Sequence, residues 1–462
     1  MLFQTWEFLG FFLAVLALFA ALRSTRFRLP VLLLASYVFY AWWDLRFPIF
    51  LIVVTTADYF FGRGIAASRS PRARKLMIFG SCLVSLSLLC SFKYLGFLTG
   101  NLQALLDICR VPWQVPKFNW LLPVGLSFFT FKSLSYTCDV YFGKIRCEKN
   151  FIRYAAYVSF FPQLVAGPIE RAGSLLPQLR HRMPLSTGDL AAGFSIFFTG
   201  LFKKAVLADM LALYVDRVYE DPTSEGGAAL LAAAIAYSWQ IYFDFAGYSD
   251  MARGVARMMG FRTILNFNNP YVSVDVRDFW RRWHISLSTW FRDYLYIPMG
   301  GSRVIKIRVW FNLMVTMLVS GLWHGAAWTF IVWGGLNGLG SLVSAEFDKK
   351  NWYLKIPKIV KQIVVFAFIT FTWVFFRAPN FSDAFAVLKG IFTWSEGDGE
   401  FVFPLIPAVL VGGVWIYQLV WASRFRPLLE NRAARIAAFA VMAALFLFLG
   451  SGANTQFIYQ QF

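Results

Sequence analysis

The sequence predicts an all-α, polytopic membrane protein, and three observations support this prediction. Hydrophobic residues make up 58% of the 462 residues and charged residues only 15%, whereas soluble domains carry roughly 25% charged residues. The mean hydropathy of +0.56 exceeds what a soluble protein of this size can bury. The apolar residues also form runs of the length that a membrane-spanning helix needs, about 20 residues. This composition excludes disordered, collagen-like and disulfide-framework proteins, and we expect one membrane-embedded domain over residues 1–462.

Apolar runs along the chain predict the individual spanning helices. They cover residues 6–22, 76–99, 120–142, 189–216, 228–249, 309–332, 362–377, 401–421 and 436–450. The apolar stretch 29–62 is interrupted by Asp44, Arg46 and Pro48, so we expect two short or tilted helices there. The segments 151–167 and 334–346 are too short or too rich in glycine for a full span, and each is a candidate re-entrant segment.

The distribution of basic residues predicts which loops face the cytoplasm. Lys and Arg gather in the loops 63–75, 144–153, 349–361 and 424–435, as cytoplasmic loops do. The loops 217–227 and 379–400 contain few basic residues and fit the outer side. We therefore expect roughly 12 crossings, with the N-terminus outside. Topology also accounts for the net charge of +19, so the expected partner is the lipid bilayer and not nucleic acid.

The stretch 253–308 differs from the spans because it is basic and aromatic and has no 20-residue apolar run. Its aromatic residues between Phe279 and Tyr294 recur at helical spacing, with Arg281 and Arg282 on the opposite side. This pattern predicts an amphipathic helix in the membrane interface. A dip into the membrane is the alternative.

Only three histidines occur in the chain, and one of them lies deep in an apolar run. His324 follows the basic residues Lys306 and Arg308 by about 16 positions, which corresponds to roughly 24 Å along a helix. Ionisable residues at such depth usually face a cavity or a partner, and a neutral imidazole in a dry site can act as a general base toward a hydroxyl. The alternative for His324 is a buried histidine that hydrogen-bonds to a neighbouring helix. His181 lies in a basic loop and is expected to be solvated.

Other chemical signals are weak. His284 lies on the predicted amphipathic helix, and the sequence does not show whether it meets His324. Two histidines with no nearby cysteine and no HExxH motif do not indicate a metal site. The five cysteines form no CxxC pair. Asp244 and Asp250 lie near the expected end of a helix, where a salt bridge to a nearby arginine, Arg253 or Arg257, is as plausible as a functional role.

Two stretches of the sequence resemble the membrane-bound O-acyltransferase family. They are RDFWRRWHISLSTWFRDYLYIPMGG (277–301) and SGLWHGAAWTFIVWGGLNG (320–338). The resemblance extends, in order, through residues 35–43, 122–143, 159–179, 242–254 and 457–462. It is to the bacterial branch, whose members take part in O-acetylation of alginate or cellulose and in D-alanyl transfer to teichoic acids.

The resemblance implies a ring of transmembrane helices around a thinned centre with re-entrant helices, and a tunnel that joins the two sides of the membrane. Residues 253–308 would form the cytoplasm-facing amphipathic or re-entrant region, and residues 309–346 the helices that carry the intramembrane histidine. His324 corresponds to that active-site histidine and His284 to the second histidine of the family. Members pass an acyl group from a cytoplasmic thioester to an acceptor outside.

Further expectations follow from the same resemblance. The expected donor-binding residues are Arg277, Arg281, Arg282, Trp283 and Arg292, where arginine suits phosphate groups. The expected tunnel-lining residues are Trp323, Gly325, Asn337 and Asp244. The sequence does not choose between Trp323, Asn337 and a backbone N–H as the group that stabilises the oxyanion.

The resemblance also predicts donor, location and partners. We expect acetyl-CoA as the donor and no bound cofactor, because AGPIERAGSLLPQL (166–179) is most similar to the exopolysaccharide-acetylating members. The expected location is the bacterial cytoplasmic (inner) membrane. The expected partners are an extracytoplasmic, esterase-like acyl-acceptor protein and a polysaccharide synthase machinery. The alternatives are D-alanyl transfer from a carrier protein, a transporter or flippase, and a non-enzymatic scaffold.

Overall fold

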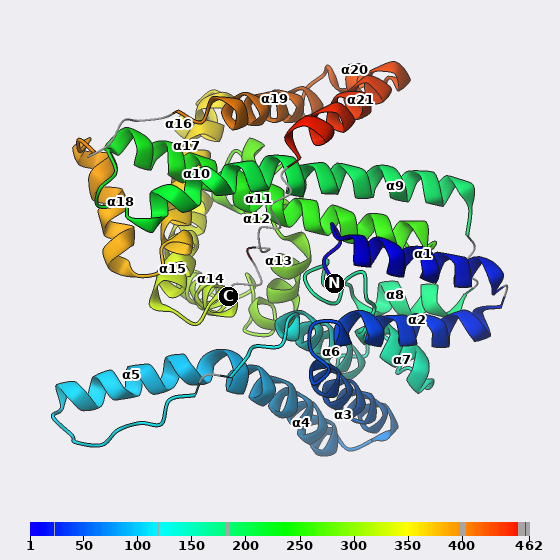
Figure 1. Ribbon diagram of the computed structural model, residues 1–462. Coiled ribbons are helices and arrows are strands. Elements are labelled where there is room, and N and C mark those ends of the chain that lie inside the picture. The colour runs from blue at the N-terminus through cyan, green and yellow to red at the C-terminus, as the bar shows by residue number, and fades with distance from the viewer. Residues whose placement is uncertain (23, 119, 182–184, 398–402, 451–457, 459–462) are drawn as a thin grey trace. The chain divides into compact units, whose positions relative to one another are not determined.

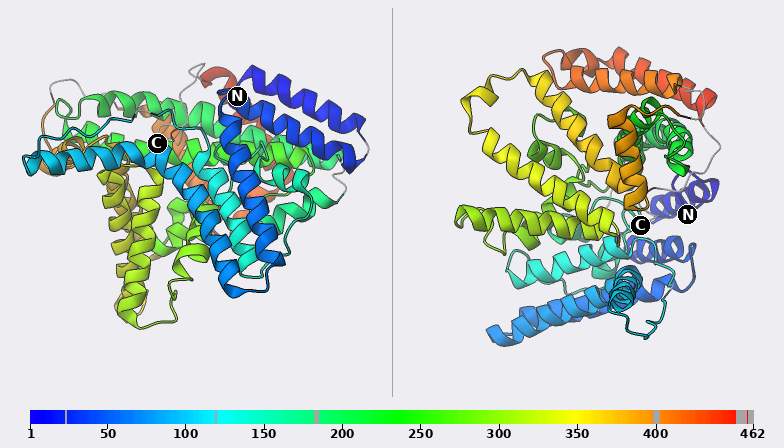
Figure 2. Two further views of the ribbon diagram at one scale, coloured as in Figure 1. Left: turned by 90° about the horizontal axis from the view of Figure 1, so that it is seen from below. Right: turned by 90° about the vertical axis from the view of Figure 1, so that its left-hand side faces the viewer.

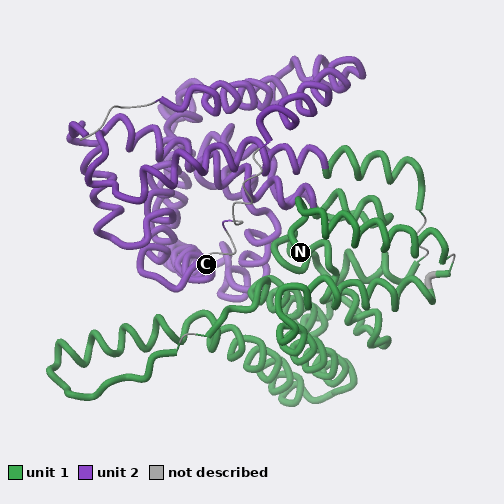
Figure 3. The backbone as a smooth tube through the Cα atoms, viewed as in Figure 1, with its two compact units in different colours: residues 1–197, 252–264 green, residues 198–251, 265–462 purple. Residues whose placement is uncertain are grey.

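The computed structural model describes residues 1–462 except 23, 119, 182–184, 398–402, 451–457 and 459–462. Within this described part of the chain every regular element is helical (Figure 1), so the predicted all-α class is confirmed. The chain divides into two compact units, coloured green and purple in Figure 3. Unit 1 comprises residues 1–197 and 252–264, and unit 2 comprises residues 198–251 and 265–462. The single domain and the ring of helices stay predictions.

Unit 1 contains the first eight α-helices. They are α1 (Trp6–Ala21), α2 (Thr25–Ala41), α3 (Phe47–Ala67), α4 (Pro71–Leu89), α5 (Leu95–Ile108), α6 (Leu126–Tyr141), α7 (Phe151–Val158) and α8 (Ala172–Arg180). The expected pair of helices in 29–62 is confirmed, because α2 ends at Ala41 and α3 begins at Phe47. Pro48 stands in the first turn of α3, where a missing N–H costs nothing.

A buried carboxylate joins three helices of unit 1. Asp58 of α3 is fully buried and accepts hydrogen bonds from the hydroxyls of Ser81 on α4 (2.7 Å) and Ser133 on α6 (2.6 Å). A carboxylate inside an apolar bundle is tolerated only when its oxygens have such donors. This cluster therefore fixes the packing of α3, α4 and α6.

Unit 2 holds most of the remaining helices. The chain passes from unit 1 to unit 2 within α9 (Thr187–Phe202) and back within α11 (Gly227–Met258). Unit 2 then contains α10 (Asp209–Glu220), α12 (Val276–Arg282), α13 (Ile285–Phe291), α14 (Lys306–His324), α15 (Trp328–Phe347), α16 (Asn351–Leu354), α17 (Lys358–Arg377), α18 (Phe381–Thr393), α19 (Leu405–Trp421), α20 (Arg426–Glu430) and α21 (Arg432–Leu449).

The predicted single span 309–332 is wrong. Helix α14 ends at His324, Gly325 and Ala327 adopt extended backbone, and α15 begins at Trp328. The segment 334–346 accordingly belongs to a complete helix. The two helices pack side by side (Figures 1 and 2). Their close approach requires glycine, because a Cβ at Gly321 would overlap the carbonyl oxygen of Phe330.

The predicted continuous amphipathic helix around Phe279–Tyr294 is also wrong. It is broken at His284, whose φ of 43° lies in the left-handed region. The result is two short helices, α12 and α13, the second of which continues into a π-helical turn at Arg292–Tyr296. The aromatic residues do recur at helical spacing, but the break at His284 divides them between two helices.

Five helical stretches within the described residues are long and apolar enough to cross a membrane: Phe47–Ala67, Pro71–Ile108, Gly227–Met258, Lys358–Arg377 and Arg432–Leu449. Helices α1 and α19 are apolar but shorter. Large apolar side chains such as Phe79 and Leu83 of α4 are exposed, as side chains that face lipid would be. The chain is thus a multi-pass membrane protein, while the expected number of roughly 12 crossings stays a prediction.

Candidate active site

The fold of unit 2 brings two histidines together that are 40 positions apart in sequence. His324 is the last residue of α14, and His284 lies at the break between α12 and α13. Their ring centroids are 6.3 Å apart. Both are buried, His284 fully and His324 with only 3% of its surface exposed. The third histidine, His181, is exposed, as expected.

Aromatic side chains enclose the two imidazoles. The ring of His324 packs against Trp323 (4.9 Å), Trp333 (5.1 Å) and Phe376 (5.4 Å), as distances between centroids. The ring of His284 packs against Phe245 at 4.6 Å. Such surroundings exclude bulk water, and interactions between charges and dipoles are stronger in a medium of low dielectric constant. The enclosure therefore suits proton transfer and charge stabilisation.

A pocket of about 790 Å³, which we call the basic pocket, is lined by residues of α12 to α15. Its cationic lining residues are Arg277, Arg281, Arg292, Lys306 and Lys349. Apolar residues, among them Leu287, Leu313 and Met317, line the rest of it together with Ser320. Glu346 is the acidic residue of this lining, so positive charge prevails.

Only some of the expected donor-binding residues line the basic pocket. Arg277, Arg281 and Arg292 line it, whereas Arg282 and Trp283 do not. Arg282 forms an ion pair with Asp278 at 2.9 Å. Two of the lining arginines are ion-paired as well, Arg277 with Asp348 and Arg292 with Asp293. Trp283 is fully buried inside unit 2, where it packs on other aromatic rings.

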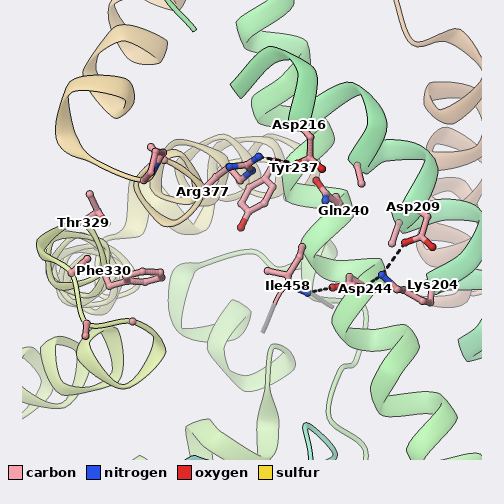
Figure 4. A pocket seen from close by; sticks show the side chains of 17 residues that line it. Lys204, Asp209, Asp216, Tyr237, Gln240, Asp244, Thr329, Phe330, Arg377 and Ile458 are labelled. Atoms are coloured by element: carbon pink, nitrogen blue, oxygen red, sulfur yellow. Dashed lines mark hydrogen bonds and ion pairs between the residues drawn. The ribbon is translucent and has the colours of Figure 1, made fainter. Parts of the chain in front are cut away.

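Figure 4 shows a second pocket, of about 540 Å³, which we call the polar pocket. Its lining includes Gly325, the residue after His324. Gly325 and Asp244, two of the expected tunnel-lining residues, line it. Trp323 and Asn337 line neither pocket. Asn337 is buried on α15 and donates a hydrogen bond to the carbonyl oxygen of Trp333 at 2.9 Å.

A buried lysine lies in the wall of the polar pocket. Lys204 is within 2.8 Å of Asp209 and 2.7 Å of Asp244, and all three are buried (Figure 4). The expected place of Asp244 near a helix end is wrong, since it lies in the middle of the 32-residue helix α11. Its expected arginine partners are also wrong, because Lys204 takes that role. Asp250 pairs with Lys203 at 2.7 Å.

Two further side chains of α11 line the polar pocket. Tyr237 and Gln240 are buried, and within the described residues neither the Tyr237 hydroxyl nor the Gln240 Oε1 has a hydrogen-bond partner. Gln240 lies three positions after Tyr237 and four positions before Asp244, so the three side chains share one face of the helix. That face offers hydrogen-bonding groups to a molecule in the pocket. Ile458, the described residue of the stretch 457–462, also lines the pocket, and the rest of that stretch lies outside the described residues.

Neither His324 nor His284 lines either pocket, but in chain order His324 falls between lining residues of the two. The basic pocket is lined by α14 residues from Lys306 to Ser320, and the polar pocket begins at Gly325. The 18 steps of the helix from Lys306 to His324 correspond to about 27 Å. The histidine therefore lies at the far end of a helix whose first turn borders the cationic pocket.

Sequence reasoning missed Lys204 and the aromatic residues Trp333 and Phe376. A signal for Lys204 existed, because it lies inside the predicted span 189–216 and a lysine inside an apolar span indicates a buried partner. No comparable signal distinguishes Trp333 and Phe376 from the other aromatic residues. Their role is visible only from their distances to His324.

Comparison with known proteins identifies the family. A model of the membrane-bound O-acyltransferase family matches residues 123–382, which include both buried histidines. The probable alginate O-acetylase of Pseudomonas aeruginosa is 41% identical over 399 residues, which cover 85% of this chain and 75% of the relative. The peptidoglycan O-acetyltransferase of Helicobacter pylori is 35% identical over 414 residues, which cover 83% and 76%.

A more distant relative has a different acyl group in its name. The teichoic acid D-alanyltransferase of Bacillus subtilis is 28% identical over 281 residues, which cover 58% of this chain and 71% of the relative. The match to the family model spans more than half of this chain, and the more similar relatives align over most of it. This chain is a member of the membrane-bound O-acyltransferase family, and so an acyltransferase of the membrane.

Proposed function

We propose that this protein carries an acetyl group from acetyl-CoA in the cytoplasm to the outer side of the membrane for O-acetylation of an extracellular polysaccharide. The observation that supports this most is His324 itself, which is buried among aromatic rings, four residues after Ser320 of the basic pocket and one residue before Gly325 of the polar pocket. The names of the more similar relatives, an alginate O-acetylase and a peptidoglycan O-acetyltransferase, support acetyl as the group and a polysaccharide as the final acceptor.

The basic pocket is the proposed donor site. Its volume of about 790 Å³ lies in the range of sites for small molecules and cofactors. Arg277, Arg281 and Arg292 would bind the phosphates of coenzyme A, and the apolar lining near Met317 would hold the thioester arm. The basic residues on this side also support the cytoplasmic placement of the pocket, with the N-terminus of the chain outside.

The proposed chemistry at His324 is general base catalysis. The imidazole takes the proton of an acceptor hydroxyl while the hydroxyl oxygen attacks the thioester carbonyl carbon. The carbon–sulfur bond then breaks, and the proton returns from the imidazolium to the departing thiolate as coenzyme A leaves. His284, which borders the donor-side helices α12 and α13, orients the thioester.

The polar pocket is the proposed acceptor site. It opens beside Gly325 and offers Tyr237 and Gln240 to an acceptor hydroxyl. At about 540 Å³ it is too small for a hydrated polymer chain. The acceptor in this pocket is therefore a hydroxyl of an extracytoplasmic, esterase-like partner protein, which passes the acetyl group to the polymer made by a synthase machinery in the bacterial inner membrane.

The first experiment tests the activity and its donor. Purified protein in detergent, with the periplasmic fraction of the producing bacterium as the source of the acceptor, receives acetyl-CoA with a radiolabelled acetyl group. A parallel sample receives a D-alanyl carrier protein as the donor instead. We expect release of the CoA thiol from acetyl-CoA that depends on His324, and no consumption of the D-alanyl thioester. Turnover of the D-alanyl thioester alone would contradict the proposed donor.

A second experiment tests the relay to a partner. The purified protein is reconstituted in liposomes with acetyl-CoA on its cytoplasmic side and alginate on the other side. We expect no acetylation of the polymer until the periplasmic fraction of the producing bacterium is added. Efficient acetylation of alginate by the reconstituted protein alone would refute the relay.

A further inference from the structure

One residue outside the proposed active site makes an unusual set of contacts with the segment that carries His284. Asn266 lies in the loop between α11 and α12 and is almost fully buried, with 1% of its surface exposed. Its backbone carbonyl accepts a hydrogen bond from the N–H of Ile285 at 2.9 Å. Its side-chain Oδ1 accepts two more from Ser286, one from the N–H at 3.2 Å and one from the hydroxyl at 2.9 Å.

Through these hydrogen bonds Asn266, a residue outside α13, caps the start of that helix. The first N–H groups of a helix have no partner within the helix, and the residue at the N-cap position usually supplies a side-chain oxygen for them. In α13 the N-cap residue is His284, whose side chain makes no capping hydrogen bond. Asn266 supplies the missing oxygens from another part of the chain, so the imidazole can extend toward His324 instead.

The same contacts oppose an unfavourable backbone conformation. His284 has φ 43° and ψ 53°, a left-handed conformation that non-glycine residues rarely adopt and that persists only when the surroundings hold it. Asn266 binds the two residues that follow His284. Asn268, two positions further on, donates from its N–H to the carbonyl oxygen of Arg282 at 2.9 Å, before the break. The loop 266–268 thus bridges both sides of the break.

Asn266 is itself fixed to a third element. Its Nδ2 donates to the hydroxyl of Ser249 on α11 at 3.1 Å, and Ser249 is buried. This bond orients the amide so that Oδ1 points toward Ser286. The chain Ser249–Asn266–Ser286 therefore connects a long spanning helix to the start of α13.

We propose that Asn266 is a positioning residue, which caps α13 in place of His284 and so holds the His284 imidazole beside His324. This proposal rests on the proposed function, in which His284 orients the thioester. Because Asn266 acts through His284, its loss reduces the catalytic rate and leaves donor binding in the basic pocket intact.

The test compares three substitutions at Asn266 with a neighbouring control. Asn266→Leu keeps the size of the side chain but removes the acceptor, and Asn266→Ala removes both. Asn266→Asp keeps an oxygen for Ser286, and a carboxylate suits a helix N-terminus. Asn268→Ala is the matched control, because the Asn268 side chain is exposed and its interactions with residue 282 use its backbone.

The measurement is CoA release from acetyl-CoA by inverted membrane vesicles of a deletion strain that carries each variant with its native partners. We expect Asn266→Leu and Asn266→Ala to lower kcat at least tenfold with the KM for acetyl-CoA within twofold of wild type. Asn266→Asp should recover most of kcat, and Asn268→Ala should equal wild type. Full kcat in Asn266→Leu would overturn the proposal.

A double variant separates positioning from a general loss of stability. In a His284→Ala background, Asn266→Leu should cost no further activity, since the residue it positions is gone. An equal further loss in that background, together with lower protein abundance in the membrane, would mean a structural role and would overturn the proposal. If His284→Ala is inactive while Asn266→Leu is fully active, the positioning role alone fails. If wild-type vesicles release no CoA, the proposed function fails instead.

Discussion

Each of the two buried histidines occupies a position that an ordinary structural histidine does not need. His324 ends α14 and is followed by Gly325 in extended conformation, and His284 lies at a break with a left-handed backbone. Each histidine thus lies at the end of a helix and packs against aromatic rings. A structure that only had to satisfy two imidazoles could do so within regular helices.

The first prediction at the residue scale concerns His324. Removing the proposed general base in His324→Ala should lower acyl transfer by about 10²–10⁴-fold, the usual contribution of general acid–base catalysis. Acetyl-CoA consumption by the purified variant together with the periplasmic fraction gives the rate, and an immunoblot of membranes gives the abundance, which should stay normal. His181→Ala is the control, because that histidine is exposed. Wild-type turnover in His324→Ala would exclude the assignment.

A second prediction at this scale uses two adjacent arginines that the fold treats differently. Arg281 lines the basic pocket, whereas Arg282 pairs with Asp278 outside it. Arg281→Ala should raise the KM for acetyl-CoA roughly tenfold, about 1.4 kcal/mol of binding free energy, and the effect should shrink at high ionic strength because salt screens exposed charges. Arg282→Ala should leave this KM unchanged. Steady-state kinetics in nanodiscs at two salt concentrations measures both, and an equal response of the two variants would contradict the donor site.

At the scale of elements, the hairpin of α14 and α15 positions His324, the proposed general base. Its two helices approach so closely that a Cβ at Gly321 or Gly334 would overlap a backbone carbonyl oxygen of the other helix. Small residues permit this kind of contact between helices in a membrane, where packing is a main source of association. Helix α12 is joined to the same hairpin, since the N–H of Val276 donates to the hydroxyl of Ser344 at 3.2 Å. Displacing α15 would therefore shift the lining residues of the basic pocket on α12 as well as those on α14.

A pair of neighbouring glycines tests this packing. Gly334→Ala places a methyl group against the Met317 carbonyl oxygen, and such overpacking typically costs about 1–3 kcal/mol of unfolding free energy. In Gly335→Ala the new Cβ lies 3.5 Å from Leu318, an ordinary contact, so the better helix propensity of alanine should prevail. Thermal unfolding in detergent should thus show a lower Tm for the first variant and an unchanged or higher Tm for the second. The reverse order would disprove the close contact.

At the scale of the whole molecule, the proposed reaction requires the two sides of the membrane to be distinct. Activated acetyl groups are made in the cytoplasm, and the polymer is outside. The basic loops predict a cytoplasmic location for 63–75, and the scarcity of basic residues predicts an outer location for 379–400. The chemistry only works if the basic pocket opens on the same side as the first of these loops.

Cysteine labelling in intact cells tests this topology. Arg69 and Glu396 are exposed, so a cysteine at either position is accessible from its own side of the membrane. A membrane-impermeant thiol reagent should label Glu396→Cys and should label Arg69→Cys only after the cells are permeabilised. The five native cysteines must first be replaced, because Cys90 and Cys109 are exposed. Labelling of Arg69→Cys alone in intact cells would invert the topology and place the donor pocket on the wrong side.

The sequence by itself determined the all-α membrane class and the approximate course of several spanning helices, because hydropathy and helical rise are properties of a local stretch of chain. The depth of His324 in the membrane stays a prediction. Only the tertiary structure decided that His284 meets His324, that Arg281 and not Arg282 lines the basic pocket, and that Lys204 is the partner of Asp244. It also decided that α14 stops at His324. These features depend on contacts between segments distant in the chain, and a local pattern contains no information on which segments come together.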